Sequence, residues 1–120
     1  MYVAIEIMCD DVWIKEVSHY LGSCGLEMFE ANLDENEYKL IGRLVNQAFA
    51  RLKQATCVDW SNSDNPMVVD AVNGLCYLSY YAMRDDAKNT TFLEQYVGNR
   101  IFELQMTEES VKARSEQSGG

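Results

Sequence analysis

The segment NPMVVDAVNGLCYLSYYAMRDDAKNTTFLEQYVGNRIFELQM, residues 65–106, decides the fold. Asn65 can cap a helix, and Pro66 suits the first helical position, where the amide hydrogen that proline lacks would have no partner. Apolar and small residues then recur on one helical face. They are Val68, Val72, Leu75, Cys76, Ser79, Ala82 and Met83. Residues 85–89 are too polar to continue this face, so the pattern predicts a helix that ends at a short polar turn.

A second helix is predicted after that turn. Thr91 and Glu94 have the spacing of a capping box, in which each side chain accepts a hydrogen bond from the other residue's backbone. The apolar face of this helix is formed by Leu93, Tyr96, Val97, Ile101 and Leu104. We expect the two helices to form a hairpin on which the rest of the chain packs. Gly74 and Gly98 lie inside them, where close packing of helices is the expected reason for a glycine.

Two further helices are predicted upstream. Asp10 and Asp11 can cap a helix that runs to about Leu21 and ends at Gly22, with Ile14 and Val17 facing inward. The next segment, residues 23–33, lacks a clean period and is interpreted as a loop with a few anchoring apolar residues.

The longest helix is predicted to start at Asp34, which forms a capping box with Glu37, and to end near Ala55. Its apolar stripe is uninterrupted and consists of Ile41, Leu44, Val45, Ala48, Phe49 and Leu52. A polar connection, residues 56–64, follows. Trp60 in this connection is expected either to attach the loop to the core or to reach toward a partner.

The predicted fold is therefore all-α, a four-helix bundle-like domain over residues 10–106. Residues 1–9 alternate weakly between apolar and other residues, which predicts a short extended N-terminal arm. This arm is either a contact between subunits or a frayed terminus. Residues 107–120 lose apolar periodicity and are predicted to form a flexible C-terminal tail, a frayed helix end followed by a disordered segment.

Composition limits the classes of function. The chain has 120 residues, the size of one domain, and its 19 acidic residues exceed its 10 Lys and Arg to give a net charge of −9. A protein that grips duplex DNA needs cations to displace phosphate counterions, so this balance argues against direct DNA binding. Residues 1–11 do not have the pattern of a signal peptide, and no apolar run is long enough to span a membrane. We expect an intracellular protein without a membrane segment.

The sequence offers no catalytic, metal or cofactor site. The four cysteines are far apart at positions 9, 24, 57 and 76, without the paired spacing of zinc ligands. They are expected to be free thiols. His19 is the only histidine, and the carboxylate pairs at 10–11 and 85–86 lie where helix capping explains them. We therefore expect a protein that is not an enzyme.

Aromatic residues suggest a protein contact instead. Tyr77, Tyr80 and Tyr81, together with Tyr96, exceed what one helical hairpin can turn inward, and a partly exposed tyrosine ring suits a protein interface. The candidate interface residues are Tyr77, Tyr80, Tyr81, Trp60 and, on the extended arm, Val3 and Ile5.

Residues 10–106 resemble the small head–tail connector (adaptor, or head-completion) proteins of long-tailed bacteriophages. The resemblance lies in an aromatic-rich helix with Tyr77, Tyr80 and Tyr81, a polar turn, a helix bearing Phe92, and an ending with Ile101, Leu104 and Gln105. Upstream, a short helix ending at 20–22 and an acid-capped helix over 34–52 also fit.

This resemblance implies a structural virion protein of the head–tail junction, assembled in the cytoplasm of the bacterial host. Such proteins form a ring under the portal protein and extend the DNA channel. A downstream tail-completion or stopper protein binds next, and DNA passes without specific binding. The alternative is a small acidic intracellular helical interaction or regulatory module that acts as a monomer or a closed dimer. Ring formation distinguishes the two hypotheses.

Overall fold

A computed structural model of the chain describes residues 11–23, 34–84 and 90–118. These residues form five helices and no strand. The helices are α1 (Asp11–Ser23), α2 (Glu35–Thr56), α3 (Pro66–Arg84), α4 (Thr91–Gln105) and α5 (Glu108–Ser118). The all-α prediction is confirmed, with five helices in the described residues where the sequence predicted four. The extended arm predicted for residues 1–9 lies outside the described residues.

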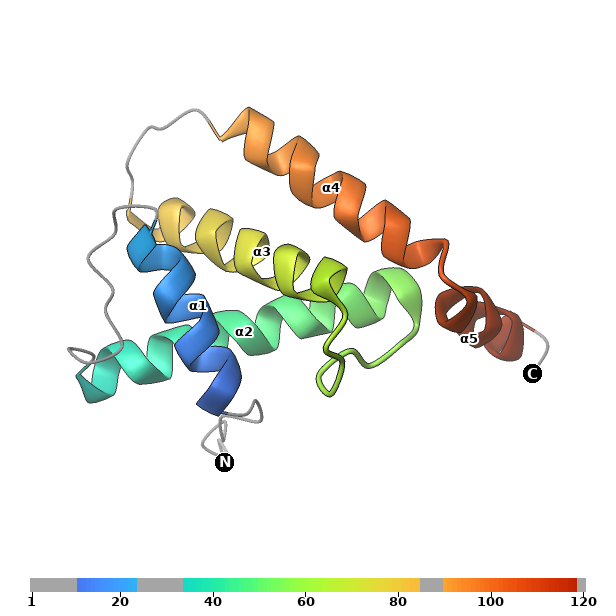
Figure 1. Cartoon of the computed structure of the whole chain (residues 1–120), viewed down its shortest axis with the longest axis horizontal. Helices are drawn as coiled ribbons and strands as arrows, with labels where there is room; N and C mark the ends of the chain where they lie inside the picture. Colours follow the sequence, from blue (N-terminus) through green and yellow to red (C-terminus); the bar gives the residue numbers. More distant parts are fainter. Residues whose placement is uncertain (1–10, 24–33, 85–89, 119–120) are drawn as a thin grey trace.

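Helix α3 occupies the centre of the molecule (Figure 1). It packs against α1, α2 and α4, and its contact with α4 is the most extensive between any two helices. The predicted α3–α4 hairpin is thus the main packing unit. Helix α1 contacts both α2 and α3, and α5 lies at the far end of α4, where it also contacts α2.

The core is built from the apolar stripes of the helices. All six predicted stripe residues of α2 are buried, and Ile14, Val17 and Leu21 of α1 are completely so. On α3 the predicted stripe is buried as far as Cys76, but Ala82 is exposed and Tyr81 is buried instead. The inward side of α3 therefore shifts around the helix toward its C-terminal end.

Local capping explains two of the helix starts. The Asp34 carboxylate accepts a hydrogen bond from the Glu37 amide at 2.8 Å, and Glu37 returns it, so the predicted box at the start of α2 is confirmed. At α3 the Asn65 side-chain oxygen accepts from the Met67 amide at 2.9 Å, with Pro66 in the first helical position. The box predicted at Thr91 is wrong, because α4 begins one residue earlier than expected. Its N-cap is Thr90, which makes no side-chain capping hydrogen bond.

The flexible tail predicted for residues 107–120 is wrong over 108–118, which form α5. Thr107 precedes this helix and caps its start. Its carbonyl accepts a hydrogen bond from the Val111 amide, and its hydroxyl accepts one from the Ser110 amide. Ser110 is fully buried and donates its hydroxyl to the Leu104 carbonyl. The guanidinium of Arg114 reaches back to the Gln105 carbonyl at 2.8 Å. These polar contacts hold α5, whose apolar pattern is too weak to predict a helix.

The α2–α3 connection is fixed by the hydroxyl of Thr56. This hydroxyl donates to the Leu52 carbonyl at 2.7 Å and accepts from the Trp60 indole N–H at 2.8 Å. Both residues are buried, Trp60 at 2% exposure. Of the two roles considered for Trp60, attachment of the loop to the core is the one the structure shows.

Replacing Thr56 by valine tests this attachment. Thr56→Val keeps the shape of the side chain but leaves the buried indole N–H without its partner, which should lower the free energy of unfolding by about 1–3 kcal/mol. Urea denaturation followed by circular dichroism measures the change. Thr56→Ser retains the hydroxyl and should lose much less. Equal losses in the two variants would contradict the role given to the hydroxyl.

Of Gly74 and Gly98, the two glycines of the α3–α4 hairpin, only Gly74 marks close packing. A β-carbon built on Gly74 would overlap the Val97 side chain of α4. Gly98 has no such neighbour within 4 Å and is exposed, so the packing reason predicted for it is wrong. Gly74 therefore lies within the α3–α4 contact, whereas Gly98 faces open space.

This difference predicts opposite effects for the same substitution. Gly74→Ala should destabilise the fold by about 1–3 kcal/mol, because the added methyl group overpacks the α3–α4 contact. Gly98→Ala should stabilise it by up to about 1 kcal/mol, because alanine is the better helix former where space is free. Thermal unfolding of both variants gives the comparison. A Gly74→Ala variant as stable as the wild type would show that α3 and α4 do not pack as closely as described.

Candidate protein-interaction surface

The four predicted interface residues that the structure describes do not gather on one exposed surface. Trp60 and Tyr81 are buried, and Tyr77 and Tyr80 are half-buried. The rings of Tyr77 and Tyr81 lie 4.5 Å apart, and Tyr20 of α1 meets Tyr77 edge-on at 6.3 Å. In the single chain, these three tyrosines pack α1 against α3. Val3 and Ile5 lie outside the described residues.

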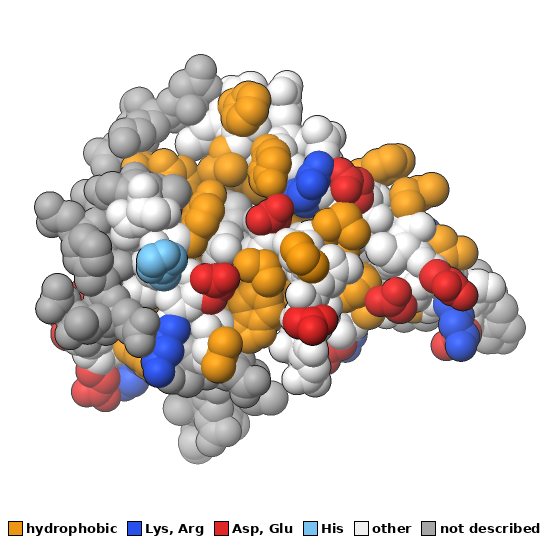
Figure 2. All heavy atoms as spheres, viewed as in Figure 1, with side chains coloured by type: hydrophobic (Ala, Val, Ile, Leu, Met, Phe, Trp, Pro, Cys, Tyr) orange, Lys and Arg blue, Asp and Glu red, His pale blue; other side chains and the backbone are white. Residues whose placement is uncertain are grey.

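Three highly exposed large apolar side chains lie instead along α4 and its C-cap. Phe92 is 82% exposed, Met106 63% and Phe102 61%. With the exposed residues Gln95 and Asn99 they follow one another at alternating spacings of three and four residues. We call Phe92, Gln95, Asn99, Phe102 and Met106 the outer stripe of α4. Figure 2 shows hydrophobic side chains along the edge of the molecule that α4 occupies in Figure 1.

The outer stripe exists because α4 is apolar on two sides. Val97 and Leu104 are buried against the core, and Leu93 and Ile101 are half-buried beside them. Once these residues face inward, the geometry of the helix turns Phe92 and Phe102 to the opposite side. The inward face predicted from the sequence wrongly included Tyr96, which is 38% exposed, and the prediction did not account for the phenylalanines left over. Their presence was the signal that this helix has a second apolar face.

Tyr96 lies at the border of the outer stripe and is tied to α3. Its hydroxyl donates to the Asp70 carboxylate at 2.9 Å, and the Arg100 guanidinium lies over its ring, 5.1 Å from the centroid. The hydrogen bond to Asp70 and the negative charge of that carboxylate raise the pKa of Tyr96. The bond fixes the ring beside the stripe.

The Tyr96–Asp70 bond makes a testable prediction about pH. Because the folded-state pKa of Tyr96 is raised, the contribution of this bond is fully present below the ordinary tyrosine pKa and is lost as the pH rises through the raised value. Asp70→Asn should bring the pKa of Tyr96 back toward 10.0, the ordinary value for a tyrosine. NMR titration of ring-labelled tyrosines measures it, with Tyr96→Phe identifying the signal. An unchanged pKa in Asp70→Asn would contradict the assignment.

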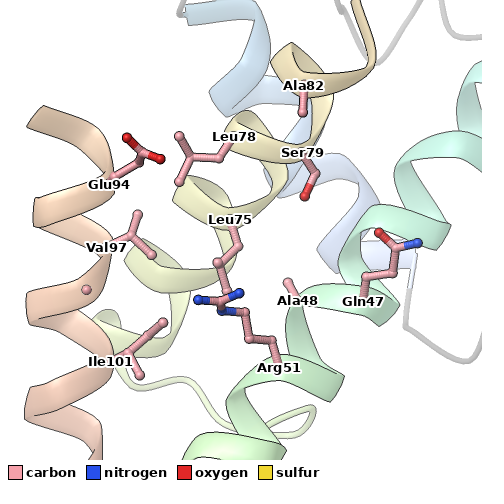
Figure 3. Close-up of a pocket in the computed structure, with 11 residues that line it drawn as sticks. Gln47, Ala48, Arg51, Leu75, Leu78, Ser79, Ala82, Glu94, Val97 and Ile101 are labelled. Carbon is pink, nitrogen blue, oxygen red and sulfur yellow. The ribbon is translucent and has the colours of Figure 1, made fainter. Parts of the chain in front are cut away.

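A groove of about 510 Å³ opens between α2, α3 and α4 (Figure 3). Leu75, Val97 and Ile101 form apolar walls, and Arg51 of α2 and Glu94 of α4 stand on its two sides. Such a groove can hold a side chain of a partner. The structure contains nothing that identifies an occupant.

Charge is distributed unevenly over the surface. Residues 38–58 contain four cations and no carboxylate. Arg43, Arg51 and Lys53 are exposed on α2, whereas Lys39 pairs with Glu35 of the first turn at 3.1 Å. Beyond the first turn of α2, exposed carboxylates lie on other elements: Asp59 and Asp64 in the α2–α3 connection, Glu94 on α4, and Glu108, Glu109 and Glu116 on α5. We call the solvent-facing side of α2 that carries Arg43, Arg51 and Lys53 the basic face of α2.

Titratable side chains meet in one hollow of the described part of the chain. His19 lines a second hollow of about 530 Å³ with Lys15, Glu16 and Asp64. Within residues 11–23, 34–84 and 90–118, no three His, Cys, Asp or Glu side chains are placed to hold a metal ion. Cys57 and Cys76 are free thiols. None of the described helices has the length and hydropathy of a membrane span. The arrangement offers surfaces for protein contact.

Comparison of the chain with protein-family models, curated proteins and solved structures gave no match.

Proposed function

We propose that this chain is a structural subunit of a phage head–tail junction. In this proposal it assembles as a ring beneath the portal protein, extends the DNA channel and receives a tail-completion or stopper protein on its other side. The proposal starts from the resemblance over residues 10–106. The all-α fold, with α3 and α4 as its main packing unit, agrees with the helical pattern on which that resemblance was based.

The observation that carries the proposal is the uneven charge. Neighbours in a closed ring meet head to tail, so each subunit must offer two different surfaces that fit one another. The basic face of α2 provides one of these, and carboxylate-bearing elements such as the α2–α3 connection provide a complementary one. Opposite charges on the two surfaces would guide subunits together and disfavour the reverse orientation.

The net charge of −9 fits a channel through which DNA passes. An acidic lining repels the phosphate backbone, so DNA would leave without being held. The basic face of α2 would then point to the neighbouring subunit or the portal rather than to the DNA. The proposal assigns no catalytic role and no cofactor to the chain.

A second candidate function is favoured by the outer stripe of α4. A small acidic helical interaction module would use such an apolar face to bind a partner or to form a closed dimer. A monomer leaves Phe92, Phe102 and Met106 in water, and large apolar side chains exposed along one side of a helix can mark a protein contact.

Assembly distinguishes the two functions. We expect native mass spectrometry and negative-stain images, recorded over a concentration series with and without the portal protein of the same phage, to show a closed ring of many copies. Arg43→Glu should weaken ring assembly at least tenfold, because it reverses a charge on the basic face of α2.

Lys112→Glu is the matched control. It makes the same change of net charge at an exposed position on α5 and should leave assembly nearly unchanged. Absence of a ring both alone and with the portal protein would contradict the connector proposal. A dimer that ignores the portal would support the interaction module.

A further inference from the structure

We propose that α4 is the contact helix of a two-fold dimer, in which the outer stripes of two copies of this chain pair in antiparallel orientation. The proposal goes beyond the connector function, because neighbours in a ring meet through two different surfaces, whereas this contact uses the same surface twice.

The spacing of the outer stripe matches that of paired helices. From Phe92 to Met106 the steps are three, four, three and four residues, which is the a/d pattern of helices that pair along a narrow seam. Met106, the C-cap, keeps helical backbone angles and so continues the stripe. All five residues are exposed, and α4 forms an edge of the molecule in Figure 1.

The second argument is self-complementarity. In an antiparallel pair each a position lies opposite a d position of the other helix. This register places Phe92 opposite Phe102 of the second copy, and Gln95 opposite Asn99 of the second copy. Rings therefore meet rings at both ends, and amides meet amides in the middle. An apolar partner would leave the Gln95 and Asn99 amides unpaired, whereas a second copy provides a donor and an acceptor for each.

The third argument is electrostatic. The outer stripe itself contains no charged residue, although the chain carries −9 overall. The antiparallel orientation also brings the positive end of each helix dipole beside the negative end of the other. A parallel pair would oppose the dipoles and place Phe92, Gln95 and Asn99 each against its own copy.

The size of the contact sets the strength of the dimer. A 15-residue helix is about 22 Å long, and one such seam buries less than the roughly 800 Å² per partner of a standard stable interface. The dimer should therefore depend on concentration. The two phenylalanines would supply most of its affinity, as aromatic anchors do in other interfaces.

The experiment is sedimentation velocity over a concentration series, with circular dichroism to verify folding. Phe102→Glu should weaken the dimer at least tenfold without unfolding the chain, because the side chain is exposed. Val12→Glu is the matched control: Val12 is a 72% exposed apolar residue of α1, away from the outer stripe. This variant should dimerise like the wild type.

A double variant tests the register. Gln95→Glu combined with Asn99→Lys places opposite charges across the antiparallel seam, so the dimer should persist and weaken as salt is added. In a parallel pair the same variant would place like charges together and abolish the dimer. A wild type that stays monomeric, a Phe102→Glu variant that dimerises unchanged, or a double variant that fails to dimerise would overturn the proposal.

The α4 dimer and the connector proposal can be tested separately. A Phe102→Glu variant that loses the dimer but still forms a ring supports both proposals. A wild type that forms the α4 dimer but never a ring supports the α4 pairing and contradicts the connector function.

Discussion

The close approach of α3 and α4 at Gly74 is the constraint on which the C-terminal half of the molecule depends. Val97 occupies the space that a side chain at position 74 would fill, and this contact fixes the rotation of α4 about its own axis. With Val97 and Leu104 turned inward, helical geometry leaves the two phenylalanines no place in the core. The exposed outer stripe is thus a direct consequence of how α4 is seated.

Hydrogen bonds at its C-terminal end hold α4 in place although few of its side chains are deeply buried. The Gln105 amide donates to the Ala55 carbonyl at 3.0 Å, which ties the end of α4 to the end of α2. Beyond it, Ser110 and Arg114 bond back to the last carbonyls of α4. The otherwise unpaired carbonyls of a helix end are thereby satisfied. This explains how a helix can use one apolar face for the core and keep a second for a partner.

Features set by local chemistry could be predicted from the sequence, and features set by tertiary contacts could not. The capping box at Asp34 and the stripe of α2 depend on neighbours in sequence, and both were correct. Helix α5 depends on hydrogen bonds to α4, and its own sequence has no apolar period. Thr107 followed by two glutamates was nevertheless an available start signal. Gly98 resembles Gly74 in sequence and differs only in what lies beside it. Likewise, the exposure of Phe92 depends on which side of α4 packs against the core.

The two candidate contact surfaces differ in their physical basis, and salt affects them in opposite directions. A head-to-tail contact through the basic face of α2 depends on attraction between exposed charges, which falls off over a Debye length of about 8 Å at physiological ionic strength. Pairing through the outer stripe of α4 brings together two chains of net charge −9, so salt screens a repulsion and favours the contact. The two surfaces also lie on different helices. One chain can therefore use both, with ionic conditions deciding which contact dominates.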